Sequence, residues 1–244
     1  MSEIIKDKVA IITGANRGIG KSIVDTFIEH GARKIYLAVR NPDSTSELET
    51  QYGDKVVTLQ ADMTDTESIN RLAELAPDVD IVVNNAGILL PSTMLEPDTW
   101  EKLEQELDVN VFGLLRVAHA FADILVKNKG ILVQLNSLAS FKNFTGLSTY
   151  CISKAAAYSL TQGLRNEFEA KGVRVLSVHP GPIATDMAKS IGFEDAPPVS
   201  VVSDSIIENL EAGEFHSFPD EMAKEFQAVY HAFAKNIVEA NLLE

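Results

Sequence analysis

The chain has 244 residues, a length that fits one large α/β domain as well as two small ones, and its 45% hydrophobic and 23% charged residues are typical of a soluble globular protein. Its net charge of −14, from 21 basic and 35 acidic residues with no cluster of Lys or Arg, argues against nucleic acid or an anionic membrane surface as the main partner. No apolar run approaches the roughly 18 residues needed to span a bilayer, and the N-terminal residues show no secretory signal, so we expect a cytoplasmic protein.

Short apolar runs rich in β-branched residues alternate with helical patterns along the first three quarters of the chain. Strands are predicted at 9–12, 34–39, 56–59, 81–83, 131–135 and 173–178. Most of these runs show little alternation of polar and apolar residues, which is typical of parallel strands covered on both faces. The strand–helix alternation therefore predicts an α/β protein with a single doubly wound parallel sheet, Rossmann-like, and helices on both faces.

We find no linker or repeat, so residues 1–244 are predicted to form a single domain. A long helix is expected from about 98 to 127. Residues 187–200 are expected to form a loop beside the substrate, and its part from 191 to 200 is expected to be mobile. Residues 214–218 are a candidate short last strand. The tail at 219–242 is predicted to be a closing helix packed on the body. Its apolar side chains recur at helical spacing, as core or subunit contacts would: Met222, Phe226, Val229, Phe233 and Ile237.

A glycine-rich loop follows the first strand and opens the first helix. Its predicted ligand-binding residues are Gly14, Asn16, Arg17, Gly18, Ile19 and Gly20. Glycines allow the backbone to turn sharply and approach a pyrophosphate, which then rests on the positive helix N-terminus. The alternative is a tight turn without a ligand. The strand before the loop, the helix after it and the second strand at 34–39 favour a dinucleotide.

The end of the second strand bears on the choice between NAD and NADP. A carboxylate there would bind the ribose 2′-hydroxyl and repel a 2′-phosphate. The position where this carboxylate is expected holds Val39 instead, and Arg40 follows it. Arg17, in the glycine-rich loop, is a second cation that could reach the same region. We therefore expect NADP(H). Asp62, after the third strand, is a candidate contact for the adenine amino group, and the alternative is an acid that caps a helix or a turn.

Tyr150 and Lys154 are four residues apart on a predicted helix and therefore share a face. The Lys154 ammonium can stabilise the Tyr150 phenolate and improve the phenol as a proton donor. Lowering a phenol pKa from about 10 by ~3 units requires roughly 4 kcal/mol of preferential stabilisation of the anion. The pair alone could be a surface feature, but Ser137 lies thirteen residues upstream and the glycine loop accompanies both.

These residues together resemble the short-chain dehydrogenase/reductase family, and the likeness runs from about residue 6 to residue 187. It is carried by the glycine loop, Asn84-Asn85-Ala86-Gly87, Asp108-Val109-Asn110-Val111, Gln134-Leu135-Asn136-Ser137, Tyr150-x-x-x-Lys154 and Pro180-Gly181-Pro-Ile-Ala-Thr185-Asp-Met187. The spacing of Asn110, Ser137, Tyr150 and Lys154 is the most specific part of the resemblance.

The resemblance implies a catalytic set. Tyr150 would act as general acid or base, Ser137 would hydrogen-bond the carbonyl oxygen, and Lys154 would bind the nicotinamide ribose. Asn110 would hold a water on Lys154. Further contacts to the cofactor are expected from Met63, Asn85, Ala86, Gly87, Pro180, Gly181, Ile183 and Thr185. Each could instead be structural, with Ser137 a cap, Asn110 a core amide and Tyr150 a packing residue.

The chain departs from the family pattern at its end, which lacks the usual strand and Gly-rich segment. A homodimer through the helices near 100–127 and 150–170 is expected, and the tetramer common in the family is in doubt. Cys151, the single cysteine, has no neighbouring base and fits a small buried hydrophobe; it rules out an intrachain disulfide. The five histidines show no ligand spacing, so we predict no metal.

Three segments, 88–95, 138–147 and 187–198, are expected to wall the substrate. They supply apolar side chains, namely Leu89, Leu90, Met94, Phe141, Phe144, Leu147, Met187, Ile191 and Phe193, with no arginine and with Lys142 and Lys189 not expected to point inward. The sequence thus predicts an NADP-dependent oxidoreductase acting on a ketone, aldehyde or secondary alcohol with a hydrophobic substituent. Alternatives are an NAD-linked alcohol dehydrogenase and a non-catalytic NADP(H)-sensing regulator. A halohydrin lyase is disfavoured by Lys154 and the intact glycine loop.

Overall fold

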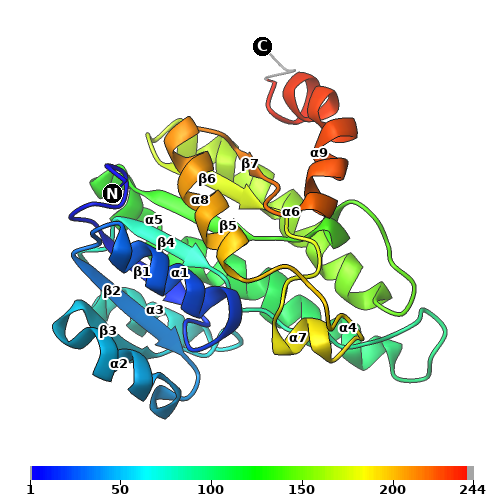
Figure 1. Ribbon diagram of the computed structural model, residues 1–244, viewed down its shortest axis with the longest axis horizontal. Helices are drawn as coiled ribbons and strands as arrows, with labels where there is room; N and C mark the ends of the chain where they lie inside the picture. The colour runs from blue at the N-terminus through cyan, green and yellow to red at the C-terminus, as the bar shows by residue number, and fades with distance from the viewer. Residues whose placement is uncertain (1, 241–244) are drawn as a thin grey trace.

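The computed structural model describes residues 2–240, and within them one seven-stranded sheet forms the centre of the molecule (Figure 1). Every strand pairs in parallel, in the order β3-β2-β1-β4-β5-β6-β7. The strands are β1 Val9–Thr13, β2 Lys34–Val39, β3 Val56–Gln60, β4 Ile81–Asn84, β5 Ile131–Leu135, β6 Arg174–Val178 and β7 His216–Ser217. The predicted fold class is confirmed. The candidate last strand at 214–218 is shorter than expected, because only two of its residues pair with β6.

Helices cover both faces of this sheet. They are α1 Gly18–Glu29, α2 Ser46–Tyr52, α3 Thr66–Leu75, α4 Thr99–Leu107, α5 Gly113–Asn128, α6 Ser148–Glu169, α7 Asp186–Lys189, α8 Ser200–Ala212 and α9 Glu221–Phe233. Short 3₁₀ turns lie at η1 Pro42–Thr45, η2 Gly53–Lys55 and η4 Leu138–Ser140, and π-helical segments at η3 Asp108–Phe112 and η5 Ala234–Val238. Apolar residues of α1 and α8 pack on one face, and those of α3, α5 and α6 on the other.

The two apolar layers explain why the strands show so little alternation. All five residues of β1 are buried. Ala10 and Ile12 belong to the cluster under α1 and α8, whereas Val9 and Ile11 belong to the cluster under α3, α5 and α6. Both pleat directions therefore require apolar side chains.

The strand order reverses beside β1, because β2 and β3 extend to one side of it and β4 to β7 to the other. In such sheets a crevice opens at the carboxyl ends of the two strands that flank the reversal. Here Thr13 joins the two ends, since its hydroxyl oxygen accepts the N–H groups of Asn85 and Ala86 at 3.0 Å each. The Asn85 side-chain amide donates back to the carbonyls of Thr13 and Gly14, at 2.9 and 3.2 Å.

The predicted long helix is a continuous helical run, Thr99–Asn128, interrupted in its winding by η3. By length and composition this run is long and apolar enough to cross a membrane, although Arg116 and Asp123 interrupt its apolar residues. Buried core helices pass the same test. Leu114, Val117 and Phe121 on α5 are fully buried beneath the sheet, which fits such a helix.

The C-terminal helix differs from its prediction. Figure 1 shows α9, in red, projecting away from the body, and Val229 and Phe233 in its second half are 84% and 53% exposed. The stripe was predicted to make core or subunit contacts, and the core alternative is wrong for Val229 and Phe233, whereas Phe226 packs on the body. Contact with a second subunit stays a prediction for the exposed residues. Residues 241 and 242 of the predicted tail lie outside the described residues.

Candidate active site

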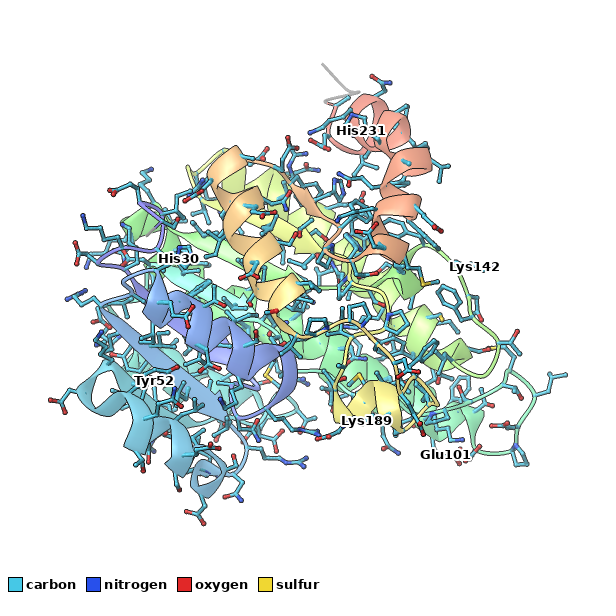
Figure 2. All side chains as sticks on the ribbon, in the orientation of Figure 1. His30, Tyr52, Glu101, Lys142, Lys189 and His231 are labelled. Carbon is cyan, nitrogen blue, oxygen red and sulfur yellow. The ribbon has the colours of Figure 1, made fainter. Side chains whose placement is uncertain are left out.

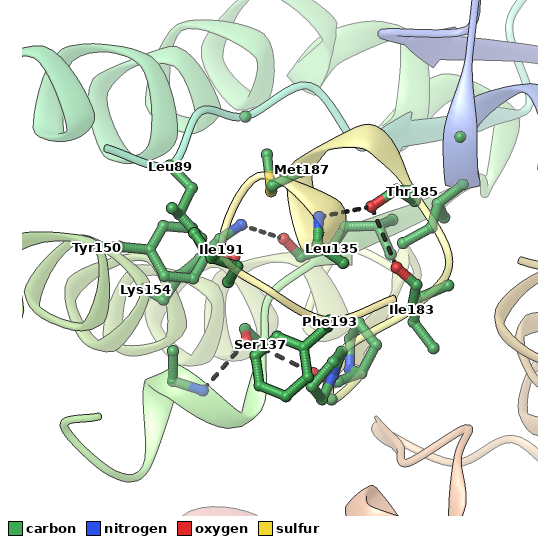
Figure 3. Close-up of a pocket in the computed structure, with 18 of the residues that line it drawn as sticks. Leu89, Leu135, Ser137, Tyr150, Lys154, Ile183, Thr185, Met187, Ile191 and Phe193 are labelled. Carbon is green, nitrogen blue, oxygen red and sulfur yellow. Dashed lines mark hydrogen bonds between the residues drawn. The ribbon is translucent and has the colours of Figure 1, made fainter. Parts of the chain in front are cut away.

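A cavity of about 770 Å³ lies at the carboxyl end of the sheet and joins the predicted motifs (Figure 3). The residues predicted from sequence that line it are Gly14, Asn16, Arg17, Gly18, Ile19, Gly20, Asn85, Ala86, Gly87, Ser137, Tyr150, Lys154, Pro180, Gly181, Ile183 and Thr185. They come from the loops after β1, β4, β5 and β6, from the first turn of α1 and from α6. The crevice expected at the reversal of strand order is therefore where these residues meet.

The glycine loop is shaped for close approach. Gly14 and Gly18 have φ of +65° and +54°, in the left-handed region that favours glycine. A β-carbon on Gly20 would collide with the Gly14 carbonyl oxygen. No acidic residue lies in the first turn of α1, so the positive helix N-terminus faces the cavity without a carboxylate in that turn. The loop therefore fits the diphosphate of a dinucleotide.

Ser137 follows β5 and is held in place by hydrogen bonds to nearby main-chain groups and to His179. Its side-chain oxygen accepts the Ala139 N–H at 3.1 Å and its hydroxyl lies 3.4 Å from the Pro180 carbonyl. Its main-chain carbonyl lies 3.2 Å from Nδ1 of His179, a fully buried residue. Burial holds the pKa of His179 well below its ordinary value, so the ring is neutral and Nδ1–H donates.

Tyr150 and Lys154 lie one turn apart on α6, as the spacing predicts (Figure 3). The Lys154 Nζ donates to the Leu135 carbonyl at 2.8 Å and lies 5.7 Å from the centre of the Tyr150 ring. Burial lowers the pKa of Lys154 to about 8, against an opposing effect of the Glu106 carboxylate. Burial raises the pKa of Tyr150, and the Ser137 hydroxyl acts in the opposite direction. The expected lowering of the phenol pKa by Lys154 is therefore not found, because burial sets the direction and the Ser137 hydroxyl is the group that opposes it.

Asn110 lies in η3, where the helix widens, and all of its described bonds go to structural partners. Its Oδ1 accepts the Ile88 N–H at 2.9 Å, and its Nδ2 donates to the Ile88 carbonyl and to the Ser153 hydroxyl, each at 2.9 Å. It does not line the cavity. Asn110 therefore holds the chain after Gly87 against α6, a contact that the sequence did not predict.

Three expected cofactor contacts also lie outside the cavity lining: Arg40, Asp62 and Met63. Arg40 is exposed after β2. The Asp62 carboxylate accepts the Thr64 N–H and hydroxyl at 2.9 and 2.8 Å, so it makes the turn contact that was the alternative for it. Met63 is buried, with its side chain against Gly113.

Arg17 has an acidic partner that its position in the sequence did not suggest. Its Nη1 lies 3.1 Å from Asp186 Oδ2, and both side chains are largely exposed. Asp186 begins α7, so the ion pair joins the glycine loop to the segment that carries Met187. Thr185, the N-cap of α7, lies against Gly18 in the same place.

The walls of the cavity are mainly apolar, as expected. Of the predicted substrate residues, Leu89, Phe144, Leu147, Met187, Ile191 and Phe193 line it. The prediction was wrong for Leu90, Met94 and Phe141, which do not line it. Phe141 instead packs against His179, with ring centres 4.6 Å apart. Lys142 and Lys189 are exposed at the periphery of the molecule and do not line the cavity (Figure 2).

Sequence reasoning missed two residues beside the site. Glu106 is fully buried one helical turn before Asn110, and this spacing is a signal that could have indicated it. Met222, from α9, lines the cavity, although it lies 72 positions after Tyr150 and no motif marks it. Cys151, expected to be a buried hydrophobe, is buried.

Comparisons with known proteins agree with this geometry. Residues 8–195 match the family described as short chain dehydrogenase. An uncharacterized oxidoreductase of Staphylococcus aureus strain N315 is 35% identical over 200 residues, which cover 79% of this chain and 85% of that protein. A crystal structure of a short chain dehydrogenase from Burkholderia cenocepacia in complex with NADP is 33% identical, covers 98% of this chain and 99% of that one, and superimposes with a TM-score of 0.87.

A more distant structure shares the fold alone. It is a short chain dehydrogenase/reductase from Burkholderia phymatum in complex with NAD, 19% identical, with a TM-score of 0.83 over 99% of this chain and 98% of that one. The solved relatives thus carry either of the two dinucleotides.

Proposed function

We propose that this chain transfers hydride between NADP(H) and a carbonyl compound or secondary alcohol with a hydrophobic substituent. The proposal starts from the family: the chain belongs to the short-chain dehydrogenase family, whose members are oxidoreductases that use a nicotinamide cofactor. One observation carries the proposal. A single cavity is lined at once by the glycine loop, by Ser137, Tyr150 and Lys154, and by apolar walls.

The preference for NADP(H) rests on the charges near the glycine loop. β2 ends in the buried Val39 with no carboxylate, and Arg40 follows it. Arg17 is paired with Asp186 in an exposed ion pair, which is typically worth at most about 1 kcal/mol. A 2′-phosphate offers charge-assisted, bidentate bonds and would draw Arg17 away from that partner. The relative solved with NADP, 33% identical to this chain, supports the same choice.

The chain's own residues would handle the proton, while a bound reduced nicotinamide supplies the hydride. The Tyr150 phenol, whose pKa burial raises, is fully protonated at neutral pH and would donate its proton to the carbonyl oxygen. The Ser137 hydroxyl would hydrogen-bond the same oxygen as negative charge develops there. With a pKa of about 8, Lys154 is mostly an ammonium at pH 7 and would stabilise the phenolate that remains.

Asn110 is proposed as a supporting residue of this set. Its bonds to both backbone groups of Ile88 fix the chain that follows Gly87, and Gly87 lines the cavity beside Lys154. We also propose that Asn110 holds a water on Lys154, as the family resemblance implies.

The test is a panel of ketones and aldehydes followed by loss of NADPH absorbance, repeated with NADH. We expect NADPH to give a kcat/KM far above that of NADH, and Arg40→Ala to reduce this preference. Tyr150→Phe should retain NADPH binding, measured by fluorescence titration, and lose turnover by about 10² or more. Equal use of both dinucleotides would favour an NAD-linked dehydrogenase. NADPH binding without turnover of any member of the panel would favour the sensing regulator.

A further inference from the structure

We propose that Met222 is a specificity-determining residue, which forms the wall of the cavity against which the apolar substituent of the substrate packs. The inference rests on the proposed function, because it identifies a residue that would contact the substrate of that reaction and select its substituent. Met222 is the one residue of α8, β7 and α9 that lines the cavity.

Met222 has apolar surface to bury. Its side chain is 39% exposed, and Phe193, from the segment after α7, lines the same cavity and is 45% exposed. An apolar group that enters the cavity would remove surface of both side chains from water, which is favourable by about 25 cal/mol per Å². The thioether is flexible and polarizable, so it suits an alkyl or aryl group of variable shape.

Asp220 fixes Met222 relative to the site. Its side chain is buried, with Oδ2 accepting the Gly181 N–H at 2.7 Å and Oδ1 accepting the Ala223 N–H at 3.0 Å. Asp220 therefore caps α9 and is also hydrogen-bonded to Gly181, which lines the cavity. A β-carbon on Gly181 would lie 2.9 Å from Asp220 Oδ1, so the two chains are in close contact.

A second anchor ties α9 to the residue that follows Ser137. Leu138, Phe218 and Ala223 form a small buried cluster, so the first turn of α9 packs directly on the turn that begins at Ser137. Further along α9, the Tyr230 hydroxyl lies 3.0 Å from the Tyr158 hydroxyl of α6. Met222 is thus set at a defined place relative to Ser137 and Tyr150.

The position of Met222 in the chain suggests that it serves selectivity and not the shared chemistry. The family match ends at residue 195, before α8 begins, whereas Ser137, Tyr150 and Lys154 all lie within it. The wall is therefore supplied by a segment outside the region that carries the family's motifs.

The experiment compares Met222→Ala and Met222→Leu with the parent protein on two ketones, acetophenone and 2-butanone. If the larger substituent packs on Met222, Met222→Ala should lower kcat/KM for acetophenone by about tenfold, chiefly through KM, with little change for 2-butanone. Met222→Leu should retain most of the parent's value. The matched control is Val229→Ala on the same helix, which does not line the cavity and should leave the ratio of the two kcat/KM values unchanged.

A binding measurement separates this inference from the proposed function. The dissociation constant of 1-phenylethanol, measured by calorimetry, should rise about tenfold in Met222→Ala and stay constant in Val229→Ala. If the parent turns over no ketone, but the dissociation constant of the alcohol rises in Met222→Ala and not in Val229→Ala, the proposed function is wrong and the role of Met222 is supported. If the ketone ratio and the alcohol's dissociation constant are both unchanged in Met222→Ala, or the alcohol does not bind the parent, the wall is overturned.

Discussion

At the scale of single residues, the Glu106 carboxyl connects a wall segment of the site to both reactive groups. It is fully buried, its Oε1 accepts the Leu90 N–H at 2.7 Å, and its Oε2 has no hydrogen-bond partner among residues 2–240. Burial raises its pKa, and its charge in turn raises the pKa values of Tyr150 and Lys154. One carboxyl thus holds a wall segment in place and influences both reactive groups.

We predict that Glu106→Gln changes how stability depends on pH. The folded-state pKa of Glu106 is raised above its ordinary value of 4.5, so its contribution to stability is fully present below pH 4.5 and is lost as the pH rises through the folded-state pKa. Glutamine can still accept the Leu90 N–H and does not titrate. The free energy of unfolding of the variant, relative to the parent, should therefore increase between pH 4.5 and pH 8, as measured by urea unfolding.

The control for this change is Glu101→Gln, an exposed residue on the same helix (Figure 2). It should leave the pH dependence as it is in the parent. A flat difference between Glu106→Gln and the parent over this range would show that the buried carboxyl does not titrate there.

Some residues of the site could be predicted from a short stretch of sequence, and others depend on contacts between distant segments. Tyr150 and Lys154 were predictable together because the period of a helix alone puts them on one face. The glycines were predictable because φ and close contact restrict the loop to that residue type. The Arg17–Asp186 pair and the lining by Met222 were not, because they depend on chain segments that only the folded topology brings together.

At the scale of elements, α9 and η5 are joined to the body by polar side chains around the buried His216. The Tyr158 hydroxyl on α6 lies 2.6 Å from His216 Nε2 and 3.0 Å from the Tyr230 hydroxyl on α9. His216 Nδ1 lies 3.3 Å from Glu239 Oε1, just beyond η5. Burial lowers the pKa of His216 to about 4. The fastening therefore uses a neutral imidazole.

Acid should loosen this fastening. The folded-state pKa of His216 is depressed from 6.5, so its contribution is present above pH 6.5 and is lost as the pH falls towards about 4. At about 1.4 kcal/mol per pH unit this amounts to at most about 3.5 kcal/mol. His216→Gln should remove that part of the pH dependence, so that its free energy of unfolding approaches the parent's as the pH falls from 6.5 to 4.

The exposed His231 on α9 supplies the comparison, because His231→Gln should follow the parent over this range (Figure 2). Equal slopes for the parent and His216→Gln would contradict a buried neutral imidazole at this position.

The elements themselves were largely predictable, and the exceptions have physical reasons. Continuous apolar runs identified six strands to within two residues at each end, because a sheet covered on both faces demands them. The π-helical η3 gives no periodic signal over five residues. The stripe on α9 has helical spacing, but spacing alone does not say whether the apolar face meets the body or solvent.

At the scale of the whole molecule, an apolar surface follows the outer face of η3 and α5. Phe112 is 50% exposed and Leu115 is 36% exposed, on the long helical run that the sequence predicted as half of a paired-helix dimer contact. Large side chains of this kind are normally covered when they cluster. We therefore keep the homodimer as a prediction for this face.

The double variant Phe112→Asp/Leu115→Asp should shift a dimer to a monomer in light scattering, because two carboxylates per subunit would have to be desolvated at the contact. Val229→Asp on the exposed face of α9 tests the competing surface. Dissociation by Val229→Asp alone would place the contact on α9, and a parent protein that is monomeric at all concentrations would refute the dimer.

The bonds through which Thr13 joins the ends of β1 and β4 have a thermodynamic consequence. Because these bonds already hold the two sides of the cleft together, little conformational entropy is lost when nucleotide binds. The measured affinity should therefore be close to the intrinsic affinity of the contacts. Nucleotide that favours the native chain in this way shifts the denaturation equilibrium by mass action, and the melting temperature should climb with the logarithm of its concentration.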